Sequence, residues 1–318
     1  MRAKDTYFVR VFDSDRPDAT IGVGECALFK GLSADDLADY EATLSAMCRA
    51  PRSALTSSYS SIRFGFEMAL RRCESTEWSR GDLGIPINGL IWMGDKATMV
   101  RRIKEKLDAG FKVLKLKIGG INFDDELDLL RYIRREYRAD ILEIRLDANG
   151  SFKAEEALDR LNKLSEYGIH SLEQPIKAGQ AEAMALICSR SPIAIALDEE
   201  LIGTRSYDGA RRLVEDIRPQ YLVLKPALCG GFSGADDYVD IANTLGIGWW
   251  ATSALESNVG LYAIARWVAS KAVAMPQGLG TGQLYSNNIP SPLELRGSSL
   301  WCNQARAWGD MTDMPWRQ

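Results

Sequence analysis

The chain reads Lys115-Leu116-Lys117, Asp147-Ala148-Asn149, Glu173-Gln174-Pro175, Asp198-Glu199-Glu200 and Leu224-Lys225-Pro226. Each of these groups closes a short apolar run. From Lys117 through the three acidic positions to Lys225, the steps are 30, 26, 25 and 27 residues. Because a strand, a helix and their turns take roughly 30 residues, this spacing predicts five successive strands that each end in an ionisable group.

Eight strand candidates follow the N-terminal quarter of the chain, and amphipathic stretches at 124–136, 154–167 and 235–245 lie between them. The eight candidates are residues 85–93, 112–118, 142–147, 169–173, 193–198, 220–225, 246–252 and 275–281. Strands that alternate with helices at a steady period favour a TIM-like (β/α) barrel of the α/β class over a doubly wound sheet. In a barrel the C-terminal strand ends converge on one mouth, so the five charged groups should meet there.

The rest of the chain predicts a smaller α+β domain. Residues 6–12 and 20–27 are typical of a β-hairpin, Ser33 has the character of a helix N-cap, and 62–73 is expected to be a second helix. A glycine-rich boundary gives three expected parts: residues 1–84 as an N-terminal α+β capping domain, 85–282 as the catalytic barrel, and 283–318 as a segment that returns to the capping domain.

Composition limits the classes of partner. The net charge is −4 and the pI about 5.4, without a basic block, which argues against nucleic acid and anionic membranes. No apolar run approaches the roughly 18 residues needed to span a bilayer. The six cysteines form no C-x-x-C pair, which favours a reduced, cytoplasmic protein. Composition leaves open whether the chain is a monomer or a homo-oligomer.

The strand-end charges have two possible explanations. Acidic residues at such junctions commonly cap helices, and an isolated K-x-K is usually a pair of surface lysines. Together, however, Asp147, Glu173 and Asp198 would direct hard oxygen ligands to one point, which suits Mg²⁺. Lys117 and Lys225 would then face each other across the metal.

Other candidate sites have less support. His170 is the only histidine and precedes a strand, so we interpret it as structural. Residues 231–235 lack the final glycine of a nucleophile elbow. The glycine-rich turn at 278–282 ends the eighth strand, where it could bind a phosphate or let backbone amides approach another anionic group.

The five groups, with Gly24-Glu25-Cys26 and Gly31-Leu32-Ser33 near the N-terminus, resemble the signature of the enolase superfamily, muconate-lactonizing-enzyme subgroup. The resemblance covers nearly the whole chain. It implies a modified (β/α)7β barrel with an α+β capping domain. It also implies Mg²⁺, for which Mn²⁺ can substitute, bound by Asp147, Glu173 and Asp198, with no organic cofactor.

The resemblance further implies that Lys117 removes a proton α to a substrate carboxylate and that Lys225 stabilises the enediolate that forms. Lys115 would assist as a neighbouring cation. The expected reaction is a syn dehydration. The same lysine pair leaves an N-acylamino-acid racemase, a dipeptide epimerase or a muconate-type cycloisomerase as alternative enzymes. A non-enzymatic alternative is a metal-binding barrel without catalysis.

A small-molecule dicarboxylate is the expected substrate. Dipeptide epimerases of this family are similar to one another in having acidic residues on the eighth strand, and 278–282 has none. Strand alternation predicts that Arg145 points into the mouth, where a guanidinium suits carboxylates. Further substrate contacts are expected from Lys115, Ser253, Glu256 and Gly280.

Overall fold

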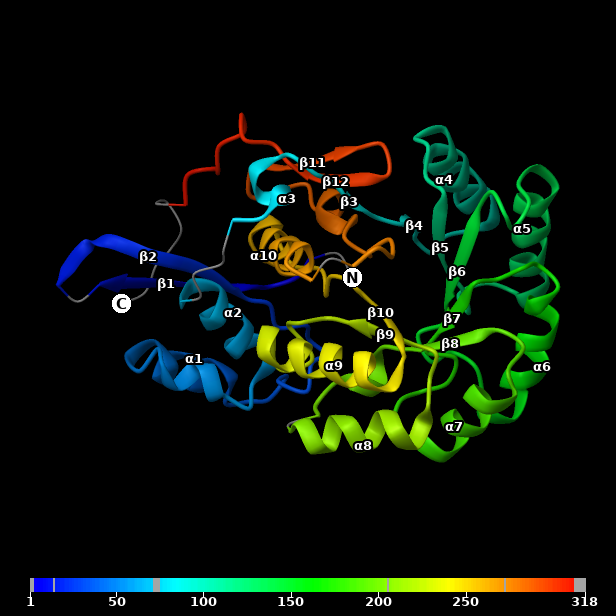
Figure 1. The fold of residues 1–318 in the computed structure, drawn as a ribbon, viewed down its shortest axis with the longest axis horizontal. Helices are drawn as coiled ribbons and strands as arrows, with labels where there is room; N and C mark the ends of the chain where they lie inside the picture. Colours follow the sequence, from blue (N-terminus) through cyan, green and yellow to red (C-terminus); the bar gives the residue numbers. More distant parts are fainter. Residues whose placement is uncertain (1–2, 14, 71–74, 205, 272, 312–318) are drawn as a thin grey trace.

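The computed structural model describes residues 3–13, 15–70, 75–204, 206–271 and 273–311, and Figure 1 shows its ribbon. Seven parallel strands form one curved sheet in the order β10-β9-β8-β7-β6-β5-β4. They are β4 (Gly89–Ile91), β5 (Val113–Lys117), β6 (Glu143–Asp147), β7 (Ser171–Glu173), β8 (Ala194–Leu197), β9 (Tyr221–Leu224) and β10 (Gly248–Ala251). The α/β barrel predicted from the strand spacing is therefore confirmed.

The predicted eighth strand of the barrel, residues 275–281, is reduced to isolated bridges. Residues 275–281 form no extended strand and make two isolated parallel bridges, Gln277 to Ile87 and Gly278 to Thr252. Ile87 precedes β4 and Thr252 follows β10, so these bridges join the two edges of the sheet. Proline and glycine in this segment shorten the pairing, because proline lacks a donor and glycine weakens a strand.

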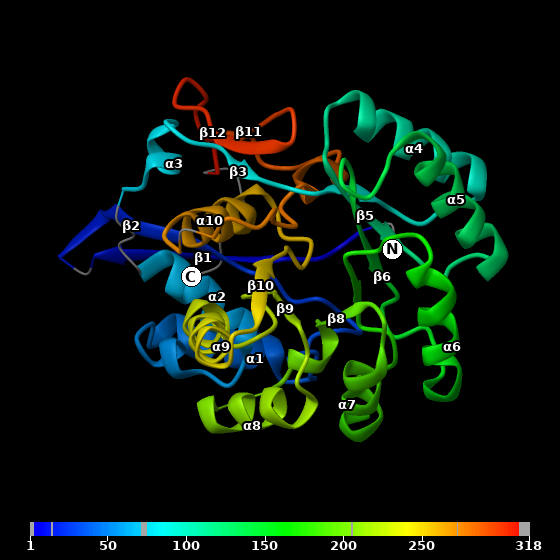
Figure 2. The same ribbon diagram turned by 45° about the vertical axis from the view of Figure 1, so that its right-hand side comes forward.

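Helices cover the outside of the sheet (Figures 1 and 2). They are α4 (Lys96–Asp108), α5 (Phe123–Glu136), α6 (Ala154–Ser165), α7 (Ala181–Arg190), α8 (Tyr207–Ile217), α9 (Gly231–Leu245) and α10 (Asn258–Ala269). Short 3-10 turns occur elsewhere: η1 (Ser53–Thr56) in the N-terminal segment, η2 (Glu199–Leu201) after β8 and η3 (Thr281–Leu284) after α10. Helix α5 shows why these helices form. Asn122 caps it by accepting from the Asp124 amide at 2.9 Å, and acidic residues in its first turn and basic residues in its last turn stabilise the helix dipole. Among the described residues, every helix falls short of the length and apolar character that a bilayer crossing requires.

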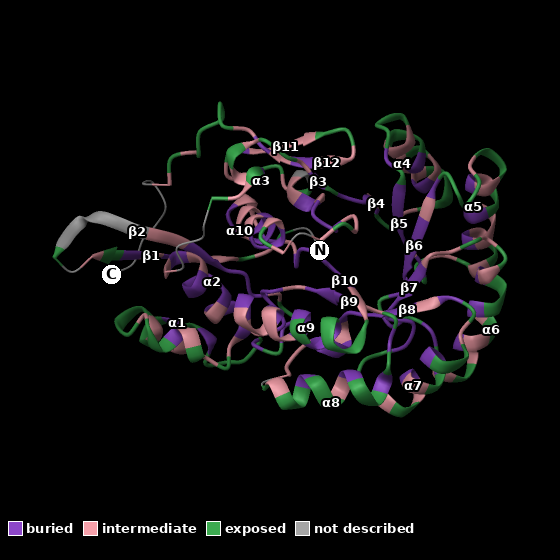
Figure 3. Ribbon diagram, viewed as in Figure 1, coloured by how far each residue is buried: buried purple, intermediate pink, exposed green. Residues whose placement is uncertain are grey.

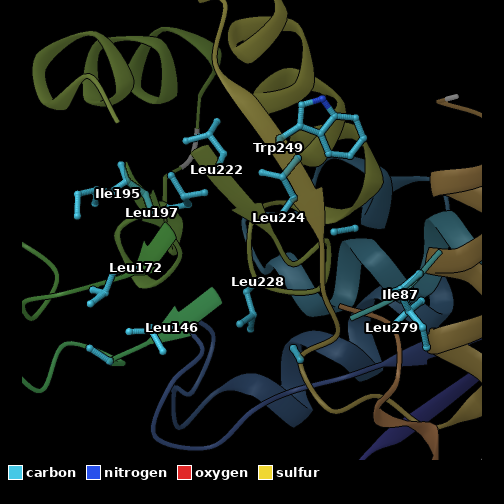
Figure 4. Packing of buried hydrophobic residues seen from close by; sticks show 14 of the residues in the cluster. Ile87, Leu146, Leu172, Ile195, Leu197, Leu222, Leu224, Leu228, Trp249 and Leu279 are labelled. Atoms are coloured by element: carbon cyan, nitrogen blue, oxygen red, sulfur yellow. The ribbon is translucent and has the colours of Figure 1, made fainter. Parts of the chain in front are cut away.

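Alternation along the strands separates the core from the site. Leu146, Leu172 and Leu222 are fully buried in the main apolar cluster, which Figure 4 shows together with the neighbouring strands. The burial map in Figure 3 shows the strands buried and the outer faces of the helices exposed. Because successive side chains on a strand point to opposite faces, the residues next to these leucines, Asp147 and Glu173 among them, point into the barrel.

The N-terminal segment contains a long hairpin, β1 (Tyr7–Asp13) and β2 (Arg16–Cys26), and two helices, α1 (Tyr40–Arg49) and α2 (Ser60–Leu70). The prediction of a helix starting at Ser33 was wrong, because residues 30–39 form turns. The Ser33 hydroxyl instead accepts from the Phe29 amide at 2.9 Å. Asp35 is the residue that caps a helix here: it accepts from the amides of Ser60 and Ser61 at the start of α2.

Two buried carboxylates join this segment to the barrel. Glu67 of α2 accepts from the Phe232 amide at 2.5 Å, at the start of α9. Glu25 at the end of β2 accepts from the amides of Ser257 and Gly260, both at 2.9 Å, at the start of α10. Each carboxylate therefore satisfies free N–H groups at the positive end of a barrel helix.

Residues after η3 form a small antiparallel sheet with the entry to the barrel. Strand β11 (Leu293–Arg296) pairs with β12 (Ser299–Cys302), which pairs with β3 (Ile85–Pro86). The buried indole of Trp78, in the short helix α3 (Glu77–Arg80), donates to the Leu300 carbonyl at 2.8 Å. The C-terminal segment therefore contacts residues 78–86, at the junction of the expected domains. It also contacts the barrel at the start of α10, where the Asn258 side chain donates to the Ile289 carbonyl at 2.6 Å.

Candidate active site

Strand register places the charged groups side by side at one end of the barrel. Lys117 on β5 is the register partner of Asp147 on β6, which is the partner of Glu173 on β7. Glu173 pairs in turn with Ala196, two residues before Asp198. Lys225 directly follows β9. One end of the sheet therefore carries the three carboxylates, flanked by lysines.

The lysines contact these carboxylates directly. The Lys115 ammonium lies 2.8 Å from Asp147 Oδ2 and 2.7 Å from Glu173 Oε2. Lys117 donates to Asp147 Oδ2 at 2.5 Å and to Asn149 Oδ1 at 2.7 Å, and Lys225 forms an ion pair with Asp198. Positive charge thus lies against all three carboxylates.

Burial and charge act against each other in this cluster. Burial alone would raise the pKa of Asp147, but Lys115 and Lys117 outweigh it and hold that pKa below its ordinary value. Burial and the neighbouring Asp147 raise the pKa of Glu173. Burial would lower the pKa of Lys115 and of Lys225, but the adjacent carboxylates raise both. Each carboxylate of the cluster therefore lies against a lysine of opposite charge, which offsets the cost of burying both groups.

The donor set fits a hard divalent cation. Asp147, Glu173 and Asp198 are each at most 2% exposed and offer only carboxylate oxygens, the ligands that Mg²⁺ prefers. The Lys115 ammonium already occupies the space between two of them. In the described part of the chain no three His, Cys, Asp or Glu side chains have the arrangement of a formed cation site.

A cavity of about 210 Å³ opens above the charged cluster. Lys115, Lys117 and Lys225 line it, with Phe29 and Leu32 from the N-terminal segment. Its other lining residues include Asn88, Leu90, Trp92, Asn149, Glu199, Ser253, Ala254, Leu255, Gly280 and Thr281. A larger cavity, of about 850 Å³, lies between α2, α9, α10 and residues 308–311, away from every predicted site residue. Chemistry, not size, identifies the smaller cavity as the candidate site.

Arg145 lies too deep for the predicted substrate contact. It does point into the barrel and is 1% exposed, but it lies two residues before Asp147, or roughly 6.6 Å further down the strand. Its guanidinium donates to Glu143 and to the Pro276 carbonyl, and it stacks 4.4 Å from the Trp250 ring. It is absent from the cavity lining, so we withdraw its assignment to the substrate.

Glu256 also differs from its prediction. Its side chain is fully buried behind the loop after β10, where Oε2 accepts from the Ala254 amide at 2.7 Å. Ser253, predicted with it, does line the cavity, and so does Gly280. Ser253 in the cavity wall and Glu256 behind it are three positions apart in the same loop, and the amino-acid type alone does not reveal which of them faces the cavity.

Replacing Glu256 by glutamine should change how stability depends on pH. Burial raises the pKa of Glu256 to about 7, with Lys4 lowering it and Glu25 raising it, against an ordinary 4.5. The folded chain therefore holds this proton more tightly than the unfolded chain, so stability falls as pH rises from about 4.5 to 7, by on the order of 3 kcal/mol. The neutral amide of Glu256→Gln lacks this dependence.

Thermal unfolding between pH 5 and 8 measures the effect. The Tm of the unsubstituted protein should fall relative to that of Glu256→Gln as pH rises. The exposed residue Glu155 supplies the matched control, since Glu155→Gln should leave the Tm difference constant. A constant difference for Glu256→Gln as well would contradict the prediction.

Two amide residues at the strand ends, Asn149 and Gln174, have roles that the sequence pattern did not predict. Asn149 has φ +44°, accepts from Lys117 and donates to Glu199 Oε1 at 2.9 Å. Gln174 has φ +42°, and its Oε1 accepts from the amides of Asp198 and Glu200. Asparagine tolerates this left-handed region better than most residues. An amide side chain one or two residues after a strand-end carboxylate was therefore the available signal.

Comparison with known proteins agrees with this geometry. Residues 98–301 match the family described as enolase C-terminal domain-like. An o-succinylbenzoate synthase from Desulfotalea psychrophila is 49% identical over 250 residues, covering 76% of this chain and 68% of the relative.

Solved structures and more distant relatives extend this comparison. The crystal structure of MenC from the same organism aligns with a TM-score of 0.78 at 38% identity, covering 93% of this chain and 99% of that one. An L-amino acid-D/L-Glu epimerase from Francisella philomiragia is 25% identical, with 62% of this chain and 55% of the relative covered. Barrel, strand-end carboxylates and lysines, and these matches together show that the chain belongs to the enolase superfamily.

Proposed function

We propose that the protein is an o-succinylbenzoate synthase, a hydro-lyase of menaquinone (vitamin K2) biosynthesis. It would dehydrate 2-succinyl-6-hydroxy-2,4-cyclohexadiene-1-carboxylate to o-succinylbenzoate. The relative of that name, 49% identical over most of this chain, supports the reaction. The observation that carries the chemistry is the pair Lys117 and Lys225, which line one cavity from either side of the three carboxylates.

The proposed reaction needs one proton acceptor and one proton donor on the same face of the substrate. Lys117 removes the proton α to the ring carboxylate, and the electron pair of the C–H bond passes into that carboxylate. The C–O bond to the hydroxyl then breaks, Lys117 returns its proton to the departing oxygen, and water and an aromatic ring result. A single group serving both half-steps accounts for syn stereochemistry.

Lys225 has a different part in the proposal. It directly follows β9, four strands from β5 in the sheet order, and its ammonium remains protonated beside Asp198. From there it stabilises negative charge on the opposite face of the substrate. When bound by Asp147, Glu173 and Asp198, Mg²⁺ or Mn²⁺ supplies electrostatic stabilisation of the charge that develops on the substrate carboxylate.

The second carboxylate of the substrate has polar groups available in the cavity wall. The Ser253 hydroxyl lies 2.5 Å from that of Thr281, and both line the cavity with Gly280. This short contact gives a paired hydroxyl group that can donate to an anion. Ser253, Gly280 and Lys115, which also lines the cavity, therefore remain our assignments for substrate contact.

The proposal also includes a domain arrangement and a location. Residues 1–84 would act as a cap, which Phe29 and Leu32 support because they reach the cavity above the lysines. The barrel would comprise residues 85–282, and residues 283–318 would return to the cap. Free thiols at Cys26, Cys188 and Cys229 favour a reducing, cytoplasmic setting.

Incubation with the cyclohexadiene substrate and Mg²⁺ tests this function. The expected result is an ultraviolet absorbance change as the aromatic product forms. Epimerase and cycloisomerase chemistry is the alternative, favoured by the same lysine pair and by the distant epimerase relative. Residues 278–282 offer no carboxylate for a substrate ammonium. Epimerisation of a dipeptide in the absence of dehydration would overturn the proposal.

A further inference from the structure

Leu255 has an unusual backbone conformation in the cavity wall. Its φ is +58°, in the left-handed region that leucine rarely adopts. It lies in the loop between β10 and α10, and it lines the cavity with its neighbour Ala254. Such a conformation persists only where the surroundings determine it, and these positions cluster at functional sites.

Three hydrogen bonds hold this conformation. The Leu255 amide donates to Ser253 Oγ at 3.2 Å, and the Leu255 carbonyl accepts from Lys4 Nζ at 2.9 Å and from the Tyr285 hydroxyl at 2.7 Å. Lys4 comes from the start of the chain and Tyr285 from beyond η3. The two residues that secure the carbonyl are therefore 251 and 30 positions away in sequence.

Lys4 connects two walls of the cavity. Its ammonium also donates to the Ala254 carbonyl at 3.1 Å and lies 5.8 Å from the centre of the Phe29 ring. Phe29 forms part of the cavity wall on the capping side. The half-buried Lys4 ammonium thus contacts both the barrel loop and an aromatic residue of the capping segment, residues 1–84.

Glu25 secures the other end of the same loop. Its Oε1 accepts from the Ser257 amide and from Thr6, and its Oε2 accepts from the Ser257 hydroxyl at 2.6 Å and the Gly260 amide. Glu25 is fully buried, and its charge faces Lys4. The loop is consequently fixed on both sides of Leu255 by residues of the capping segment.

Charge balance favours this arrangement. Burial lowers the pKa of Lys4, whereas Glu256 and Glu25 raise it. Burial, Glu25 and Glu256 raise the pKa of Tyr285 to about 12, which keeps its hydroxyl a donor. The half-buried Lys4 ammonium has two carbonyl acceptors and faces two acidic side chains, so it avoids the penalty of an unpaired charge away from water.

We propose that Lys4, Glu25 and Tyr285 are positioning residues that hold Leu255 and Phe29 as the wall of the substrate cavity, so that the capping segment sets substrate affinity without these three residues touching the substrate. This inference rests on the proposed function for its kinetic consequence. Its structural part, an ordered loop dependent on Lys4 and Tyr285, is independent of which reaction the site performs.

Kinetics of Lys4→Met and Tyr285→Phe test the affinity. The methionine keeps the length of Lys4 without its donors, and the phenylalanine removes one hydroxyl. Each variant should raise KM, by about tenfold for Lys4→Met, while kcat changes less than about threefold, because uniform binding is lost and the proton-transfer groups are untouched. Lys30→Met is the matched control, since Lys30 forms an exposed ion pair with Asp5 of little expected value.

Amide hydrogen exchange of the protein without substrate tests the loop itself. Exchange at residues 254–257 should accelerate in Lys4→Met and Tyr285→Phe and stay unchanged in Lys30→Met. Faster exchange without synthase activity in the unsubstituted protein would uphold the positioning role and refute only the function. Unchanged exchange in both variants, or a fall in kcat at constant KM, would overturn the inference.

Discussion

Lys117→Ala should lower dehydration turnover by at least the factor of about 10² to 10⁴ that general acid-base catalysis supplies, and by more if the group serves both half-steps. Lys117 lies at the end of β5, lines the cavity, and donates to Asp147 and Asn149. Alanine removes the only atom of this side chain that can carry the proton. In deuterated solvent, Lys117→Ala should also lose exchange of the substrate α-proton.

Lys225→Arg supplies the comparison that separates the two roles. Arginine keeps a positive charge beside Asp198 but changes its geometry. Turnover should fall because the developing negative charge is stabilised less well, while α-proton exchange continues through Lys117. If Lys225→Arg abolished exchange and Lys117→Ala retained it, the roles would be reversed. Exchange retained by both variants on opposite faces would indicate a two-base racemase.

Removing divalent cations should abolish turnover, and adding Mg²⁺ should restore it. Asp147, Glu173 and Asp198 supply a buried set of hard oxygen donors whose charge is balanced by Lys115, Lys117 and Lys225. Losing a cation that neutralises the developing carboxylate charge would remove several kcal/mol of stabilisation. Turnover assays with a chelator, followed by Mg²⁺, measure the effect.

Mg²⁺ binding can also be measured through thermal stability, without an activity assay. A ligand that binds only the folded state at a hundred times its Kd stabilises that state by about 2.7 kcal/mol, so Mg²⁺ should raise the Tm. Asp147→Asn should remove this increase, and the exposed residue Asp159 provides the control Asp159→Asn, which should keep it. Full turnover by chelated protein, with no Mg²⁺-dependent change in Tm, would refute the metal site.

The sequence predicted those features that depend on local spacing. The charged strand ends recur at nearly constant intervals, and one barrel repeat has about that length, so β5 to β9 were placed correctly. Parallel strands in one register then necessarily bring Asp147 and Glu173 together. The proposed catalytic and metal-binding roles of these residues remain predictions.

The incorrect predictions have two physical causes: the depth at which a side chain lies in the barrel, and contacts between residues that the local sequence pattern does not show. Alternation correctly placed Arg145 inside the barrel, but it does not say how far below the mouth a side chain ends. Ser33 has the composition of a helix cap, yet its hydroxyl accepts from Phe29 instead. The support of Leu255 by Lys4 joins positions 251 residues apart, and no local pattern encodes such a contact.

The carboxylates of Glu25 and Glu67 limit how N-terminal segments can be exchanged between this protein and its relatives. Each belongs to the N-terminal segment but completes the first turn of a barrel helix, α10 or α9. An exchange of N-terminal segments between relatives would therefore divide each helix from its cap. We expect viable hybrids to retain an acidic side chain at both positions, so these two sites limit where a crossover can be made, even though neither belongs to the barrel sequence.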